Sequence, residues 1–317
     1  MSVTNPHSIK TLSVVVPCYN EQESLPIFVD EFLKRVTLPD VKIECIFVDD
    51  GSKDDTLAVL RDLQSQHPDL VRLISFSRNF GKESALYAGL QAATGDAVAV
   101  MDADLQDPPE LLPEMVRLIT EEDYDCVGTR RVDRKGEPPI RSFFARMFYR
   151  LINSISDTEM VDGARDYRLM TRQMVDSILE LSEYNRFSKG LFSWVGYKTH
   201  YMEFDNVERV AGETHWSFWN LFSYSITGII NFSTFPLKIA TGAGMVAFAV
   251  AVVMGIIIFI RTLAFGDAVA GWTSQVLIIL FLGSFQLLSL GIIGEYIGKI
   301  FLETKRRPVY VVREETP

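Results

Sequence analysis

Short apolar runs alternate with amphipathic stretches through the first third of the chain. Four of these runs have strand length, at residues 12–17, 43–48, 71–76 and 97–101. Between them, residues 25–36 and 57–66 show helical spacing, and a further helix is expected from Lys82 to about Ala93. Strand and helix therefore alternate four times, which predicts an α/β domain with a mainly parallel sheet and right-handed crossovers.

The pattern changes near Phe235, where long uncharged stretches replace the alternation. Residues 239–260 and 271–294 contain no charged side chain, and each is long enough to cross a hydrocarbon core of about 30 Å. Basic residues lie at the outer ends of this pair, whereas the short loop between them carries one acid and no base. We expect two transmembrane helices with both termini cytoplasmic, although Arg261 weakens the charge asymmetry. Two buried core helices are the alternative.

An aromatic and apolar stretch at 216–232 precedes the first of these helices. Such a stretch either lies in the headgroup region of a membrane or packs as an ordinary helix on the preceding domain. The patterns together predict four parts of the chain. They are a cytoplasmic α/β domain at 1–215, an interfacial amphipathic segment at 216–236, two transmembrane helices at 237–302 and a cytoplasmic tail at 303–317.

The apolar run at 97–101 ends abruptly in Asp102, followed by Asp104 and Gln106. In an extended segment, residues two apart share one face, so these three side chains can converge just past a strand end. Carboxylate and amide oxygens are hard donors that suit Mg²⁺ or Mn²⁺, which take their other ligands from water and phosphates. An acidic turn that caps the next helix is the alternative interpretation.

Polar residues also follow the other predicted strands, with Glu21, Asp50 and Arg78 after the first, second and third. The carboxyl ends of parallel strands meet at one edge of a sheet, where α/β proteins bind their ligands. We therefore expect one site that combines acids for a base or ribose with acids for a metal ion that holds a diphosphate.

The middle region contains Arg130 and Arg131, a basic stretch at 141–153, and the segment from Asp162 to Arg168. Guanidinium groups suit phosphate, so Arg130 and Arg168 are candidate phosphate ligands. Exposed ion pairs are the alternative for either arginine.

Composition excludes several classes of function. A net charge of −10 argues against a nucleic-acid partner. The chain has no Gly-x-Gly-x-x-Gly after its first strand and no Gly-x-x-x-x-Gly-Lys-Ser/Thr, and its four histidines have no zinc spacing. Three cysteines without ligand spacing are expected to be buried thiols in a reducing compartment. The polar first ten residues predict no signal peptide.

Taken in order, these motifs resemble glycosyltransferase family 2, and within it the polyprenyl-phosphate glycosyltransferases, a group that includes dolichol-phosphate mannose synthase and the bactoprenol glucosyltransferases. The motifs are Pro17-x-Tyr19-Asn20-Glu21, Val48-Asp-Asp50-Gly-Ser, Arg78-Asn-x-Gly81, Asp102-Ala-Asp104-Leu-Gln106-x-Pro108-Pro-Glu and Arg209-x-x-Gly-Glu. The segment from Gly294 to Lys299 and the following Lys305-x-Arg307-Pro308-x-Tyr310 also resemble the tail of the bactoprenol enzymes.

The resemblance implies a nucleotide-diphospho-sugar transferase domain of the GT-A fold and a set of site residues. The donor site would comprise Pro17, Tyr19, Glu21, Val48, Asp50, Arg78, Lys82, Asp102, Ala103, Gln106 and Arg130. The metal ion, Mg²⁺ or Mn²⁺, would be held by Asp102, Asp104 and Gln106. The acceptor phosphate would meet Arg130, Arg131, Arg168, Arg209 and His215. The catalytic residues would be Asp104, Asp162, Asp166 and Arg168, with the choice of base open between Asp162 and Asp166.

Two departures from the family pattern stand out. The position six after Arg209 is often lysine in the family, and His215 replaces that permanent cation with a titratable one. The usual Gly-Asp-Phe-Arg appears as Arg165-Asp166-Tyr167-Arg168, so Asp166 keeps its register while its neighbours change.

The resemblance implies transfer of a hexose to undecaprenyl or another polyprenyl phosphate, with UDP-glucose as the first choice of donor. The product would be a lipid-linked sugar for cell-envelope glycosylation, made at the cytoplasmic face of a bacterial inner membrane by a multi-pass protein. A lipid phosphate is already an anion, so the harder task is to stabilise the departing nucleoside diphosphate, which a divalent ion does. We expect direct, inverting displacement.

Several alternatives stay open. The sugar could be N-acetylglucosamine, galactose or mannose, and the chain could form a homo-oligomer. A processive polysaccharide synthase is a second enzyme class, although such enzymes usually carry Gln-x-x-Arg-Trp and more membrane spans. A catalytically idle scaffold that binds nucleotide sugar and a transporter are the classes without glycosyl transfer, and the Asp102, Asp104 and Gln106 set argues against the scaffold.

Overall fold

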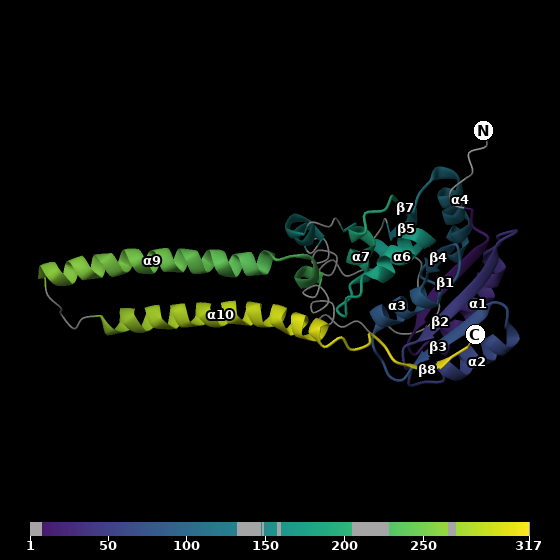
Figure 1. The fold of residues 1–317 in the computed structure, drawn as a ribbon, viewed down its shortest axis with the longest axis horizontal. Coiled ribbons are helices and arrows are strands. Elements are labelled where there is room, and N and C mark those ends of the chain that lie inside the picture. The colour runs from purple at the N-terminus through teal and green to yellow at the C-terminus, as the bar shows by residue number, and fades with distance from the viewer. Residues whose placement is uncertain are drawn as a thin grey trace.

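A computed structural model describes residues 8–131, 147, 149–156, 160–204, 228–265 and 271–316. A mixed sheet packed between helices forms the N-terminal domain, and two long helices extend from one side of it (Figure 1). The predicted α/β architecture with a mainly parallel sheet is therefore confirmed. The prediction that the three cysteines are buried thiols is also confirmed, since Cys18, Cys45 and Cys126 are all buried and free.

The first half of the chain alternates strands and helices as its apolar pattern predicts. The elements are β1 (Thr11–Cys18), α1 (Ser24–Arg35), β2 (Lys42–Asp49), α2 (Thr56–Gln66), β3 (Val71–Phe76), α3 (Lys82–Ala92), β4 (Ala97–Val100), η1 (Pro109–Leu111) and α4 (Leu112–Glu122). The second half adds β5 (Cys126–Arg131), β6 (Ala164–Thr171), α6 (Arg172–Glu180), α7 (Ser188–Trp194), β7 (Thr199–Phe204), α9 (Phe235–Phe265), α10 (Trp272–Thr304) and β8 (Val312–Glu315).

The sheet has eight strands in the order β7-β5-β6-β4-β1-β2-β3-β8. Strands β4, β1, β2 and β3 run parallel to one another, so their carboxyl ends share one edge. Strand β6 is antiparallel to both β4 and β5, which reverses the direction on the other side of β4. This reversal brings the start of β6 next to the carboxyl end of β4.

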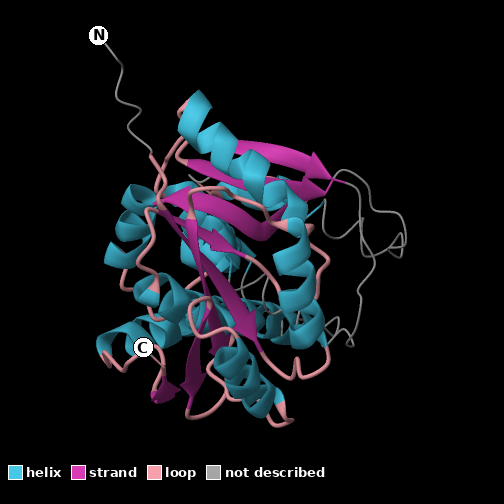
Figure 2. Cartoon of the chain, turned by 90° about the vertical axis from the view of Figure 1, so that its right-hand side faces the viewer, coloured by secondary structure: helices cyan, strands magenta, loops and turns pink. Residues whose placement is uncertain are grey.

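Helices cover both faces of the sheet (Figure 2). On one face Phe28 of α1 and Met115 of α4 pack in a core with Phe47 of β2. On the other face Leu86 of α3 and Met174 of α6 pack in a second core. Because successive strand residues point to opposite faces, a strand that is buried on both sides reads as a continuous apolar run, as β1 and β4 do.

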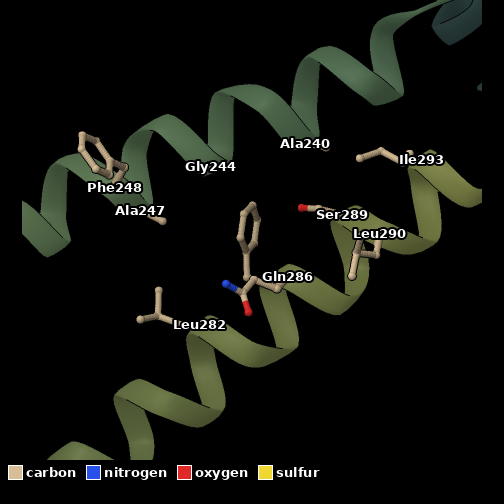
Figure 3. Close-up of a pocket in the computed structure, with 10 residues that line it drawn as sticks. Ala240, Gly244, Ala247, Phe248, Leu282, Gln286, Ser289, Leu290 and Ile293 are labelled. Carbon is tan, nitrogen blue, oxygen red and sulfur yellow. The ribbon is translucent and has the colours of Figure 1, made fainter.

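The two long helices agree with the predicted pair of membrane spans. Helix α9 has 31 residues and α10 has 33, each longer than the roughly 20 residues that a bilayer core requires. Both are long and apolar enough to cross a membrane, and their apolar side chains are largely exposed, as Phe248 and Leu287 are. A groove of about 590 Å³ lies between them, where Gln286 and Ser289 are the polar side chains (Figure 3). Helix α10 continues to Thr304, beyond the uncharged stretch that ends at 294.

The segment after α10 returns to the N-terminal domain (Figure 1). Strand β8 pairs antiparallel with β3 and forms an edge of the sheet. The Tyr310 ring stacks on Phe76 with centroids 4.8 Å apart, and its hydroxyl donates to Gln91 Oε1 at 2.9 Å. Within the tail predicted at 303–317, the structure forms β8, which joins the sheet of the N-terminal domain.

Candidate active site

The carboxyl edge of the parallel strands carries the predicted cluster of polar residues. Glu21 follows β1, Asp50 follows β2, Arg78 follows β3 and Asp102 follows β4. The register aligns Cys18 with Asp49 and Val15 with Val100, so these loops lie at neighbouring strand ends. The prediction that these residues share one sheet edge is confirmed, while their individual roles stay predictions.

Asp50 joins the loop after β2 to the loop after β3. One carboxylate oxygen accepts from the Phe80 N–H at 2.6 Å, and the other accepts from the Gly81 N–H at 2.9 Å. Burial raises the pKa of Asp50 to about 6, although the two N–H groups favour its charged form. The next residue, Gly51, has φ +63°, and a Cβ there would lie 2.3 Å from the Arg78 carbonyl carbon. The two loops are therefore packed backbone to backbone, and only glycine fits at position 51.

Hydrogen bonds of Glu21 hold the loop after β1. The Glu21 N–H donates to Thr56 Oγ1 at 2.8 Å, and the Glu21 carboxylate accepts a short hydrogen bond from Ser24 Oγ. Pro17 and Val48 are register partners on β1 and β2, and Tyr19 is half-buried beside them. The Val48 side chain is fully buried, so a ligand at this edge can meet only its backbone.

Lys82 connects two predicted site residues across the sheet edge. Its ammonium lies 2.7 Å from Asp102 Oδ1 and 2.6 Å from Asp166 Oδ2. The pairing of Val100 with Arg168 explains the meeting, because the chain past β4 then faces the start of β6. Burial alone would raise the pKa of Asp166, but the charges of Lys82 and Lys189 outweigh it and hold that pKa well below its usual value. The Lys82 ammonium thus bridges the two carboxylates.

The loop from Asp102 to Asp107 is fixed from within. Asp104 is buried and accepts from the Gln106 N–H at 3.1 Å, with Leu105 in the left-handed region at φ 56°. Asp107 is fully buried and accepts from Arg165 Nε at 2.9 Å. Burial raises the pKa of Asp107 to about 6, against the opposing charge of Arg165. The Ala103 side chain is buried as well, so only the Ala103 backbone can contact a sugar-nucleotide donor.

The oxygen donors of this loop fit a divalent cation that is shared with a substrate. Among the described parts of the chain, no three His, Cys, Asp or Glu side chains form a cluster that could hold an ion alone. Asp102, Asp104 and Gln106 offer two carboxylates and one amide, which is the partial oxygen shell that Mg²⁺ or Mn²⁺ completes with phosphate and water. The Lys82 ammonium lies 2.7 Å from Asp102 Oδ1, so this carboxylate already has a cationic partner.

The predicted arginines and Asp162 divide into two groups. The Arg168 side chain is buried, lies 3.9 Å over the Phe192 ring and donates to the carbonyls of Asp166 and Arg165. Its guanidinium therefore organises the backbone of β6, and the catalytic and phosphate-binding roles predicted for it stay predictions. Arg130 is exposed near the end of β5 and the start of β6. Arg131 and Asp162 are half-buried, and the Arg131 N–H donates to the carbonyl of Gly163, the residue after Asp162. Arg209 and His215 lie outside the described residues.

Two ion pairs of this site were missed from the sequence. The Lys82–Asp166 pair spans 84 residues and the Arg165–Asp107 pair spans 58. Both depend on β6 running antiparallel to β4, and the sequence pattern predicted only that the sheet is mainly parallel. The available signal was the replacement of the family's Gly-Asp-Phe-Arg by Arg165 to Arg168, which adds a cation next to Asp166.

Comparison with known proteins follows the same division of the chain. The model of glycosyl transferase family 2 matches residues 13–179, and the model of the GtrB C-terminal hairpin matches residues 235–300. A prophage bactoprenol glucosyl transferase homolog of Escherichia coli K12 is 42% identical over 302 residues, which cover 95% of this chain and 98% of that protein. The putative glycosyltransferase CsbB of Bacillus subtilis is 43% identical, covering 96% and 91%. The bactoprenol glucosyl transferase of Shigella phage SfV is 41% identical, covering 96% and 98%.

A solved structure shares the fold at low sequence identity. The mannosyltransferase PcManGT from Pyrobaculum calidifontis, in complex with GDP-Man and Mn²⁺, aligns with a TM-score of 0.50 and 18% identity. The alignment covers 92% of this chain and 88% of that one. At this identity the likeness supports the GT-A fold and carries no argument on substrate.

Proposed function

The chain belongs to glycosyltransferase family 2, and we propose that it transfers glucose from UDP-glucose to a polyprenyl phosphate at the cytoplasmic face of a bacterial inner membrane. The observation that carries this proposal is the extent of the similarity. Proteins named bactoprenol glucosyl transferase align at 41–42% identity over 95–96% of the chain, so the likeness includes both the catalytic domain and the hairpin.

The donor would lie along the carboxyl edge, with the nucleoside over the loops after β1 and β2. Glu21 and Asp50 offer carboxylates there, and Asp50 also fixes the loop that carries Arg78. The diphosphate would lie toward Asp102 and Asp104. A divalent ion held by Asp102, Asp104 and Gln106 would supply charge stabilisation for the leaving nucleoside diphosphate.

The acceptor needs little acid–base help, because its phosphate is already ionised. An oxygen of that phosphate attacks the anomeric carbon from the side opposite the diphosphate, the bond to UDP breaks, and the configuration inverts. The residues of this chain then act by position and charge. Asp166 is kept ionised by Lys82 and Lys189, so it can orient a group near the sugar. Arg130, whose side chain is exposed, is our candidate to meet the acceptor phosphate.

The hairpin would hold the domain beside its lipid acceptor. Helices α9 and α10 expose apolar side chains along their length, as a bilayer requires. Lys238 lies in the first turn of α9, while Lys305, Arg306 and Arg307 follow α10. This places basic residues on the side of the hairpin nearest the catalytic domain, where they favour an anionic cytoplasmic surface.

The test uses purified full-length protein with undecaprenyl phosphate, Mn²⁺ or Mg²⁺, and a panel of UDP- and GDP-sugars. We expect one lipid product with the mass of the acceptor plus one hexose, and UDP-glucose as the best donor. Asp104→Asn should abolish metal-dependent transfer, whereas Asp69→Asn, an exposed acid before β3, should leave it unchanged. A polymer would instead support a processive synthase. No lipid product with any donor would refute the proposal.

A further inference from the structure

The end of α10 contacts the loop residues Tyr184 and Asn185 of the N-terminal domain. The Glu303 carboxylate accepts from the N–H groups of Tyr184 and Asn185 and from Asn185 Nδ2, at 3.0 to 3.1 Å. Lys299 Nζ donates to Asn185 Oδ1 at 3.4 Å, and Asn231 Nδ2 donates to the Asn185 carbonyl at 2.5 Å. Every polar group of Asn185 is thus bonded to α10 or to the segment that enters α9. We call this set of residues the Asn185 clamp; it comprises Asn185, Tyr184, Asn231, Lys299 and Glu303.

A second set of contacts closes the base of the hairpin beside the clamp. Tyr296 of α10 donates its hydroxyl to the Ser233 carbonyl at 2.6 Å, and Ser233 Oγ donates to the Ile155 carbonyl at 2.6 Å. Phe187 packs in a small apolar cluster with Ile152 and with Phe232 near it. The two helices are therefore tied to each other and to the domain at the same place.

The loop that carries the clamp leads into the first turn of α7, where Ser188 and Lys189 contact residues next to the active site. The Ser188 N–H donates to the Glu83 carboxylate at 2.9 Å, and its hydroxyl makes a short bond to the same oxygen. Glu83 adjoins Lys82, whose ammonium bridges Asp102 and Asp166. Lys189 donates to the Ala164 carbonyl at 3.3 Å, at the start of β6 two residues before Asp166. The segment from Tyr184 to Lys189 therefore binds the hairpin at one end and supports the site at the other.

We propose that the Asn185 clamp is a positioning device that sets where the Lys82, Asp102 and Asp166 cluster lies relative to the membrane surface. This inference rests on the proposed function, because it concerns how a lipid acceptor meets the site. A long polyprenyl chain keeps its phosphate at the membrane surface, so transfer requires the anomeric carbon to be held at a matching position. A short, water-soluble isoprenyl phosphate diffuses to the site and does not need the hairpin to be aligned. The clamp should therefore matter for one acceptor and not for the other.

The experiment compares Glu303→Gln and Asn185→Ala with Glu295→Gln in full-length protein reconstituted in nanodiscs. Glu295 is an exposed acid on the same helix and serves as the matched charge control. We expect the two clamp variants to lose about tenfold in kcat/KM for undecaprenyl phosphate while retaining, within about twofold, kcat/KM for the short acceptor. The control should match the wild type with both acceptors. Equal losses with both acceptors, or no loss with either, would overturn the inference.

A second measurement is independent of activity. Hydrogen exchange of the Tyr184 and Asn185 amides should become faster in Glu303→Gln than in the wild type, because their acceptor is weakened, and stay unchanged in Glu295→Gln. If exchange responds in this way but the wild type glycosylates neither acceptor, the proposed function fails and the clamp stands as a structural tie. If exchange does not respond, the clamp itself is refuted.

Discussion

Replacing Lys82 with methionine should strengthen the binding of Mn²⁺ while it impairs transfer. The ammonium lies 2.7 Å from Asp102 and 2.6 Å from Asp166, so an ion that binds Asp102 must displace or repel it. Methionine keeps most of the side-chain volume and removes the charge. The variant therefore separates electrostatic competition from packing, because only the former changes the affinity for an ion.

The expected size follows from the exposure of the three groups. The side chains of Lys82, Asp102 and Asp166 are 39%, 24% and 18% exposed, so solvent partly screens both ion pairs. Ion pairs in such surroundings are each worth up to about 1 kcal/mol, and two of them together about 1 to 2 kcal/mol. That range corresponds to a factor of about 5 to 30 in an equilibrium constant. We expect the dissociation constant for Mn²⁺ to fall by this factor in Lys82→Met.

The assay is a titration of full-length protein with Mn²⁺ at one fixed concentration of UDP, which supplies the phosphate oxygens, followed by electron paramagnetic resonance of the ion that is not bound to protein. Lys82→Arg keeps the charge and should bind Mn²⁺ like the wild type. Lys53→Met removes an exposed lysine from the neighbouring loop and should have little effect. Unchanged or weaker Mn²⁺ binding in Lys82→Met would refute both the competition and the assignment of Asp102 to the ion.

Three further predictions concern other parts of the domain. Asp50 has a pKa of about 6, and its protonation removes the negative charge that accepts the hydrogen bonds of the Phe80 and Gly81 N–H groups. The affinity for UDP-glucose should therefore fall as the pH drops below about 6. In a binding titration Asp50→Asn should remove this pH dependence, and a variant that keeps it would contradict the assignment. Arg165→Met should lower the free energy of unfolding by about 3 kcal/mol at pH 8, since it leaves Asp107 buried and charged. The loss should be smaller at pH 5, below the Asp107 pKa of about 6, as denaturant unfolding would show, and equal losses would exclude this cause. Tyr310→Ala should lower the free energy of unfolding by about 2 kcal/mol, because it removes both the ring stacking and the hydrogen bond, and Tyr310→Phe by about 1 kcal/mol, because it removes only the hydrogen bond. Amide exchange across β3 and β8 should become faster in the alanine variant, and unchanged exchange would refute this prediction.

The parts of the fold that the sequence predicted are those whose signal is local. Strands β1 to β4 are short segments rich in apolar residues, and the residues that follow them, such as Asp50 and Asp102, reach one sheet edge because parallel strands end together. Strand β8 has four residues, three of them charged, and pairs with β3 more than 200 positions earlier in the chain. No local pattern distinguishes such a segment from a polar tail.

The site shows the same limit at the level of side chains. Residue chemistry predicted that Arg168 could bind phosphate, but only its place on β6 reveals that Phe192 covers it. Lys82 was placed in the donor site by resemblance, and its link to Asp166 required the direction of β6. Loop contacts such as that of Asn185 with Glu303 leave no periodic signal, because they join an irregular segment to a helix end.

The position of β8 has a consequence for how the protein is made. Helices α9 and α10 lie between β7 and β8 in the chain, so a ribosome produces both before it reaches the strand that pairs with β3. Until then the β3 edge presents unpaired backbone groups, which is the kind of surface on which strands of other molecules assemble. The eight-stranded sheet can therefore be completed only after both long helices have been synthesised, and a chain that stops before β8 keeps an open sheet edge at β3.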